Sequence, residues 1–81
     1  MQPGILELDL HGMNAYQAKT AVDAALRRAK GGTYRLRLIH GYRGGTALRD
    51  MLRTAYRSHP KVLRIELGLN PGETDLVLRE F

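Results

Sequence analysis

Three segments of the chain alternate between hydrophobic and polar residues, which is the pattern of a β-strand with one buried face. They run from Ile5 to His11, from Tyr34 to Ile39 and from Val62 to Leu67. A fourth segment, Leu76 to Leu78, is hydrophobic at every position and predicts a short strand that is buried more evenly. The side chains expected to face the core from the alternating segments are Leu6, Leu8, Leu10, Leu36, Leu38, Leu63, Ile65 and Leu67.

Two segments between these strands repeat hydrophobic residues at helical spacing. Asn14 stands three residues before Gln17, and this pair predicts a capping box at the start of the first helix. We expect Gly31-Gly32 to end that helix and Pro60 to stop the second. The hydrophobic stripes comprise Ala15, Ala18, Val22, Ala25, Leu26 and Ala29 on the first helix and Leu48, Met51, Leu52, Ala55 and Tyr56 on the second.

The elements therefore follow in the order βαβαββ, with the segment from Asn70 to Glu73 as the turn before the last strand. Because three strands have one polar face, both helices should cover the same face of a single sheet, which predicts a two-layer α/β fold. Right-handed crossovers make the first three strands parallel. Their carboxyl ends then lie at one edge, where His11, His40 and the final turn should meet. A chain of 81 residues predicts one domain, residues 1–81.

Composition restricts the chemistry of the chain. The absence of cysteine excludes disulfides, thiolate metal sites and thiol nucleophiles, and it fits a reducing compartment. We see no hydrophobic run that could cross a bilayer and no cleavable leader behind Met1, so we expect a cytoplasmic protein without a membrane partner. The net charge is +5, from 13 basic and 8 acidic residues. Most of the basic residues are arginines, which favour phosphate, although many small basic domains use such charge only for solubility.

Asp9 and His11 lie two residues apart on one strand and share its polar face, while His40 ends the neighbouring strand. A carboxylate beside a histidine orients the ring and favours its cation, which suits proton transfer or the binding of a phosphate. We therefore predict Asp9, His11 and His40 as catalytic residues. The structural alternative is that each histidine donates to a backbone carbonyl. A divalent metal held by the three residues is a weaker alternative, because their spacing fits no common metal motif.

The segment from His40 to Thr46 is a glycine-rich turn that leads into the second helix. Backbone N–H groups at a helix N-terminus attract an anion, so we predict a phosphate site there, although glycines alone indicate only a tight turn. The segment is neither a Walker loop nor a dinucleotide-binding motif, so no nucleotide cofactor is expected. Tyr42 could stack on an unpaired base. The predicted nucleic-acid-binding residues are Gly41, Tyr42, Arg43, Gly44, Gly45, Thr46, Arg49 and Arg53, with Arg35 and Arg37 on the polar face of the sheet.

Three motifs together resemble the small MutS-related (Smr) domain family, and the resemblance covers nearly the whole chain. Leu8-Asp9-Leu10-His11-Gly12 is similar to the opening motif of the family. Ile39-His40-Gly41 through Ala47-Leu48-Arg49 is similar to its central histidine–glycine loop and helix start. Pro71-Gly72-Glu73-Thr74 falls where its last glycine turn lies.

The resemblance implies a fold like the C-terminal domain of a bacterial translation initiation factor, with strand order 1-2-4-3 and the last strand central and antiparallel. It also implies nucleic-acid binding, often with endonuclease nicking of DNA or RNA. The acid and histidine of the opening motif correspond to Asp9 and His11, and the central motif to His40, Gly41 and Gly44. The central loop lacks the usual alternation of glycines and the last turn carries an acidic residue, departures that bear on cleavage rather than on the fold.

We therefore expect an Smr-type domain that binds nucleic acid and is a candidate endonuclease, and we assume a monomer. In this hypothesis the loop from His40 to Thr46 and Arg43 hold a phosphate, while His11, oriented by Asp9, transfers a proton. The rival is a non-catalytic module that uses the same loops for DNA or RNA binding alone. A third hypothesis, a protein-interaction domain that binds through the open face of the sheet, ranks last because that face is highly charged.

Overall fold

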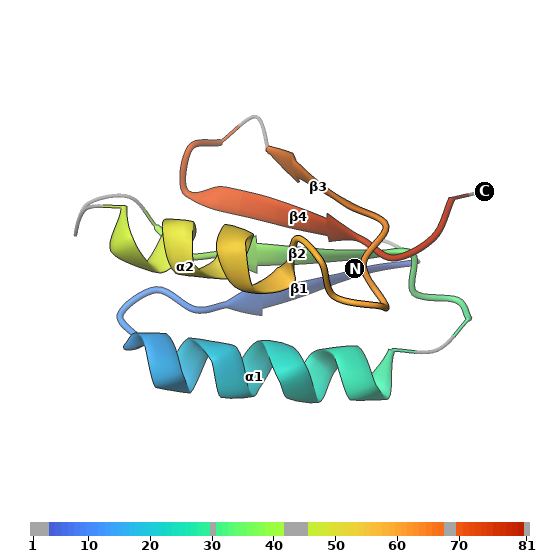
Figure 1. The fold of residues 1–81 in the computed structure, drawn as a ribbon, viewed down its shortest axis with the longest axis horizontal. Coiled ribbons are helices and arrows are strands. Elements are labelled where there is room, and N and C mark those ends of the chain that lie inside the picture. The colour runs from blue at the N-terminus through green and yellow to red at the C-terminus, as the bar shows by residue number, and fades with distance from the viewer. Residues whose placement is uncertain (1–3, 30, 42–45, 68–69, 81) are drawn as a thin grey trace.

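The chain forms a two-layer α/β fold with the predicted element order (Figure 1). The computed structural model describes residues 4–29, 31–41, 46–67 and 70–80. Within them, no helix is long and apolar enough to cross a membrane. The elements are β1 (Ile5–Asp9), α1 (Ala15–Arg28), β2 (Arg35–Ile39), α2 (Ala47–Tyr56), β3 (Arg64–Leu67) and β4 (Glu73–Val77).

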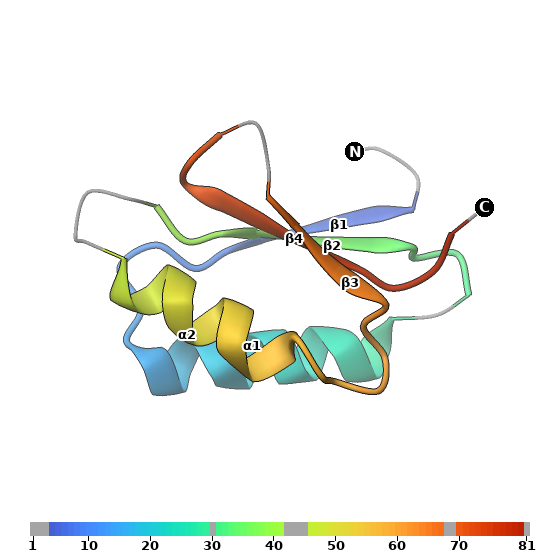
Figure 2. The same cartoon turned by 45° about the horizontal axis from the view of Figure 1, so that its top comes forward.

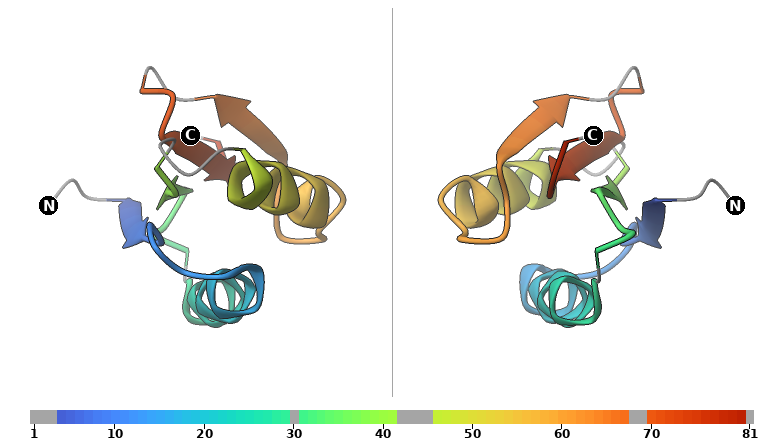
Figure 3. Two further views of the ribbon diagram at one scale, coloured as in Figure 1. Left: turned by 90° about the vertical axis from the view of Figure 1, so that its left-hand side faces the viewer. Right: turned by 90° about the vertical axis from the view of Figure 1, so that its right-hand side faces the viewer.

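The four strands form one mixed sheet with the order β1-β2-β4-β3. β1 and β2 pair in parallel, and β4 runs antiparallel to both β2 and β3. β3 therefore points in the same direction as β1 and β2, as predicted. Both helices pack on one face of the sheet and leave the other face open (Figures 2 and 3).

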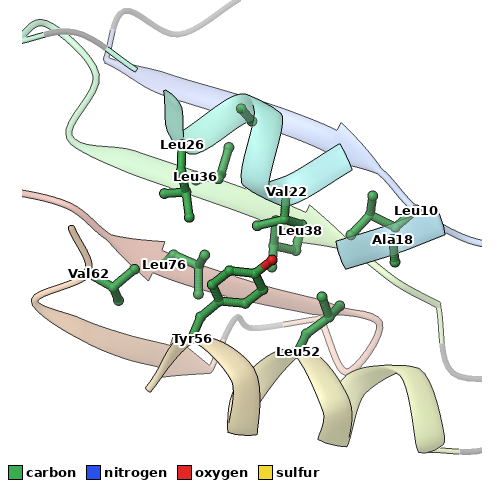
Figure 4. Close-up of a cluster of buried hydrophobic side chains, with 11 residues drawn as sticks. Leu10, Ala18, Val22, Leu26, Leu36, Leu38, Leu52, Tyr56, Val62 and Leu76 are labelled. Carbon is green, nitrogen blue, oxygen red and sulfur yellow. The ribbon is translucent and has the colours of Figure 1, made fainter. Parts of the chain in front are cut away.

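The hydrophobic core lies between the sheet and the two helices (Figure 4). Alternation along β1 and β2 directs leucines inward, and the small Ala18 and Ala25 are fully buried on the inner side of α1. Tyr56 is the largest fully buried side chain, and its hydroxyl donates to Asp23 Oδ1 at 2.6 Å, so the polar tip is not left unpaired. The buried hydrophobic residues are Leu10, Ala18, Val22, Ala25, Leu26, Leu36, Leu38, Leu52, Tyr56, Val62, Leu76 and Val77.

The predicted capping box starts α1. The side chain of Asn14 accepts the Gln17 N–H at 2.7 Å, and the Gln17 side chain accepts the Asn14 N–H at 3.0 Å. The helix ends earlier than predicted, because Ala29 already has extended backbone and precedes the two glycines. Two stripe positions are exposed rather than buried. Ala15 is the first residue of α1, and Ala55 lies beside the buried face of α2, which is centred on Leu52 and Tyr56.

The prediction for the third strand is wrong at both ends. Leu63 and Leu67 are 60% and 68% exposed, whereas Val62 is buried. β3 is an edge strand that pairs only with β4, and of its residues Ile65 packs against the core. Leu63 directly precedes this short edge strand, and Leu67 is its last residue.

The last strand also begins earlier than predicted. β4 starts at Glu73 because it pairs with a neighbour on each side along its length. Thr74 and Asp75 are therefore buried although both are polar. Both buried side chains accept hydrogen bonds from arginine side chains, and these bonds hold the arginines in place.

Candidate functional site

The ends of β1 and β2 and the turn before β4 meet at one edge of the sheet, on the left in Figure 1. The backbone N–H groups of His40 and Gly41 both donate to the carbonyl of Gly72, at 2.9 and 3.0 Å. Gly41 has a φ of 76°, which favours glycine, and a Cβ atom placed there would lie 3.6 Å from Cβ of His11. The three segments therefore meet at one edge of the sheet, as predicted.

Asp9 and His11 form an exposed pair at this edge. Oδ1 of Asp9 bonds Nδ1 of the His11 ring and also accepts the His11 N–H at 3.2 Å. The hydrogen bond to Asp9, together with its charge, raises the pKa of His11, and the same hydrogen bond lowers the pKa of Asp9. The two side chains are 60% and 72% exposed, so Nε2 of His11 is accessible to a ligand. The sequence-predicted pair is thus brought together with an oriented ring.

His40 lies in a different environment, with only 5% of its surface exposed. Its Nδ1–H donates to the carbonyl of Gly41 at 2.8 Å, and Nε2 lies 2.8 Å from Oγ1 of Thr74. Thr74 Oγ1 also accepts the Nε–H of Arg53 at 3.1 Å, so the threonine hydroxyl proton is directed at His40. Both ring nitrogens are occupied, and the ring anchors the Gly41 turn, as in the structural alternative for this residue.

The charge of Asp50 partly compensates Arg53, which forms no ion pair of its own among the described residues. Arg53 is half-buried on α2, and no carboxylate in the described ranges lies within ion-pair distance of it. Burial, followed by the charge of Arg49, lowers the pKa of Arg53. The charge of Asp50 acts in the opposite direction and favours the guanidinium cation, as a bound anion would. We refer to Asp9, His11, Gly41 and Arg53 as the strand-end site.

The neighbouring residues of the second helix form a local polar cluster. Arg49 pairs with Asp50 at 3.1 Å, and the Thr46 hydroxyl donates to the same carboxylate at 3.1 Å. Thr46 precedes α2 without a capping hydrogen bond from its side chain. The predicted residues Tyr42, Arg43, Gly44 and Gly45 lie outside the described part of the chain.

The two arginines predicted on the sheet face are held by a buried carboxylate. Asp75 is 3% exposed and accepts from Arg35 Nη1 at 2.7 Å and from Arg37 Nε at 3.1 Å. Hydrogen bonds to Asp75 raise the pKa of both arginines. Glu66 lies 2.9 Å from Arg35, so the two arginines predicted to bind nucleic acid are already paired with carboxylates.

Sequence reasoning missed Thr74 and Asp75, because it began the last strand at Leu76. The only available signal was that two polar residues directly precede a buried hydrophobic run. Among the described residues, no three His, Asp or Glu side chains gather closely enough to hold a metal ion. His40, in particular, directs its ring nitrogens at Gly41 and Thr74 rather than at Asp9 and His11.

A family model described as the Smr domain matches residues 8–73. Among solved structures, the chain is similar to the crystal structure of the Smr domain of Thermus thermophilus MutS2, with a TM-score of 0.83 and 35% sequence identity. The match covers 93% of this chain and 99% of that one. No curated protein matches the chain.

Proposed function

The chain belongs to the Smr domain family, and from this premise we propose that it binds nucleic acid and nicks a phosphodiester bond at the strand-end site. The observation that carries the proposal is the exposed Asp9–His11 pair beside the Gly41 turn. An oriented histidine that is open to solvent has one accessible nitrogen with which to bind a phosphate or transfer a proton.

Arg53 supports the binding part of the proposal. Its guanidinium is partly removed from water, and the charges of Arg49 and Asp50 act on it in opposite directions without forming an ion pair, so a phosphate would supply a direct counter-charge. The arginines on the open face are instead occupied by Asp75. Nucleic acid should therefore approach the edge of the sheet and the helices, and not the open face.

His11 supports the cleavage part. Asp9 raises the pKa of His11, which increases the fraction of imidazolium near neutral pH. In the proposed reaction water attacks phosphorus and releases one proton to solvent, the P–O bond to the leaving group breaks, and His11 donates its Nε2 proton to the leaving oxygen and then regains a proton from solvent. Asp9 stays ionised and keeps the ring in place, and His40 acts as a positioning residue that holds the Gly41 turn.

A second candidate function is DNA or RNA binding without cleavage. The burial of His40 favours it, because only one histidine at this edge is then left to move a proton. Binding by Arg53 and the loop from His40 to Thr46 would require no proton transfer.

The test is to incubate the protein with labelled duplex, single-stranded and branched DNA and RNA, with divalent metal and with EDTA. The first proposal predicts binding together with nicking of at least one substrate. Binding without cleavage under every condition supports the second candidate. Absence of binding to all substrates at low salt contradicts both.

A further inference from the structure

A groove of about 380 Å³ lies between α1 and the segment that follows α2. Its volume falls within the range of small-ligand pockets, about 300–1,000 Å³. The strand-end site does not include any of its residues. We call it the helix groove, and it is lined by Lys19, Asp23, Leu26, Arg27, His59 and Lys61.

The charge of the helix groove is positive after its own ion pairs are formed. Lys19 Nζ lies 3.0 Å from Asp23 Oδ2, and the other oxygen of Asp23 accepts the hydroxyl of Tyr56. Asp23 is the acidic residue of the groove, and Lys19 compensates it. Arg27 and Lys61 remain as cations without a carboxylate partner among the described residues.

Hydrogen bonds hold the donors of the helix groove in place. Lys61 Nζ donates to the carbonyl of Leu26 at 3.0 Å, which fixes the ammonium against the end of α1 and leaves two of its three N–H groups for a ligand. Nδ1 of His59 accepts the Lys61 N–H at 3.1 Å, so the ring proton of neutral His59 is on Nε2. The groove therefore presents preorganised donors of the kind that bind phosphate oxygens.

The distribution of charge over the domain also favours the binding of phosphate on the helix side. On the open face, three arginines and five acidic residues form one connected ion-pair network that includes Asp75 and Glu80. The helices and the segment after α2 differ from the open face, because their described residues include seven basic residues and two acidic ones, Asp23 and Asp50. Those basic residues are Lys19, Arg27, Arg28, Arg49, Arg53, Arg57 and Lys61.

We propose that the helix groove binds the sugar–phosphate backbone of nucleotides that flank those held at the strand-end site. This inference rests on the proposed function. α1 begins at the strand-end edge, and Arg27 lies twelve residues beyond Ala15, a rise of about 18 Å at 1.5 Å per residue. A single strand that keeps duplex-like stacking rises about 3.4 Å per nucleotide, so this span corresponds to about five nucleotides. A trinucleotide can therefore occupy one site only, whereas a 12-mer can reach both.

The experiment compares Arg27→Gln, Lys61→Gln and their combination with wild type, using a single-stranded trinucleotide followed by NMR and a 12-mer followed by fluorescence anisotropy. Arg64→Gln is the matched control for each single variant, because it removes one positive charge from the open face. Losing two phosphate contacts to a single strand should weaken 12-mer binding about 25-fold at 0.1 M salt and reduce the salt slope by about 1.4. Trinucleotide binding at the strand-end site should be unchanged, because it loses no phosphate contact there.

Several outcomes overturn the inference. Unchanged 12-mer affinity in the folded double variant would leave the helix groove to another ligand, such as an acidic peptide. An equal loss in Arg64→Gln would mean that net charge alone is responsible. If Lys61→Gln fails to fold, Arg27→Gln decides alone, because Arg27 makes no hydrogen bond among the described residues. Arg53→Gln should weaken both oligonucleotides, so a failure at the groove is distinguishable from a failure of the proposed function.

Discussion

Replacing Thr74 by valine removes one hydroxyl group and keeps the shape of a fully buried side chain. That hydroxyl lies 2.8 Å from Nε2 of His40 and accepts the Nε–H of Arg53 at 3.1 Å. Thr74→Val therefore leaves the His40 nitrogen buried without a partner, which should cost about 1–3 kcal/mol of unfolding free energy. Arg53 is only half-buried and its N–H can turn to water, so we assign it no further loss.

The loss is measurable by thermal and urea denaturation. One kcal/mol lowers the Tm of a domain of this size by about 4–8 °C, so a loss of about 2 kcal/mol corresponds to about 8–16 °C. Thr74→Ser is the control, because it keeps the hydroxyl and loses one methyl group, at a cost of about 1 kcal/mol. Valine should thus be less stable than serine although it retains more hydrophobic surface. A valine variant as stable as wild type would refute the role given to this hydrogen-bond chain.

Three further predictions concern the charged and backbone features of the site. The pKa of His11, measured by NMR, should lie above its ordinary value of 6.5 and should fall in Asp9→Asn. Because folding raises the pKa of His11, the protonated ring stabilises the fold at pH values below the unfolded-state pKa, and this stabilisation is lost as the pH rises through the folded-state pKa. Asp75→Asn should lower stability by at least about 1 kcal/mol, after discounting for solvent at the arginines, and increase salt-sensitive nucleic-acid binding at the open face; unchanged denaturation and binding curves would contradict this. Gly41→Ala should cost about 1–2 kcal/mol, because alanine disfavours a φ of 76°, and a Tm equal to that of wild type would show that the turn carries no such strain.

Much of the fold could be predicted because each step rests on local rules. The Asn14–Gln17 pair fixes the start of α1, and the alternating leucines of β1 and β2 fix which face is buried. The order of the sheet came from the family resemblance, not from the alternation. The errors occurred where tertiary position overrides the pattern, as at Leu63 and Leu67 on the edge strand, which their hydrophobicity placed in the core.

The candidate site shows the same difference between what local patterns determine and what tertiary position determines. Asp9 and His11 share a strand face, so their pairing follows from the period of two. His40 follows the end of β2, where no alternation dictates the direction of its ring, and only the position of Thr74 across the sheet shows that the ring is buried. The polar face of β2 looked basic because the sequence does not show that Asp75 is its neighbour.

The measurement that tests the central claim most directly is the cleavage rate and the nucleic-acid affinity of Asp9→Asn and His11→Ala beside wild type, with thermal melts to establish folding. If His11 transfers the proton and Asp9 orients it, cleavage should fall on the order of 100-fold or more, since positioned acid–base groups contribute about 10²–10⁴. Affinity should change far less, because Arg53 and the loop from His40 to Thr46 are intact. Wild-type cleavage rates in both folded variants would contradict the account and remove Asp9 and His11 from any catalytic role.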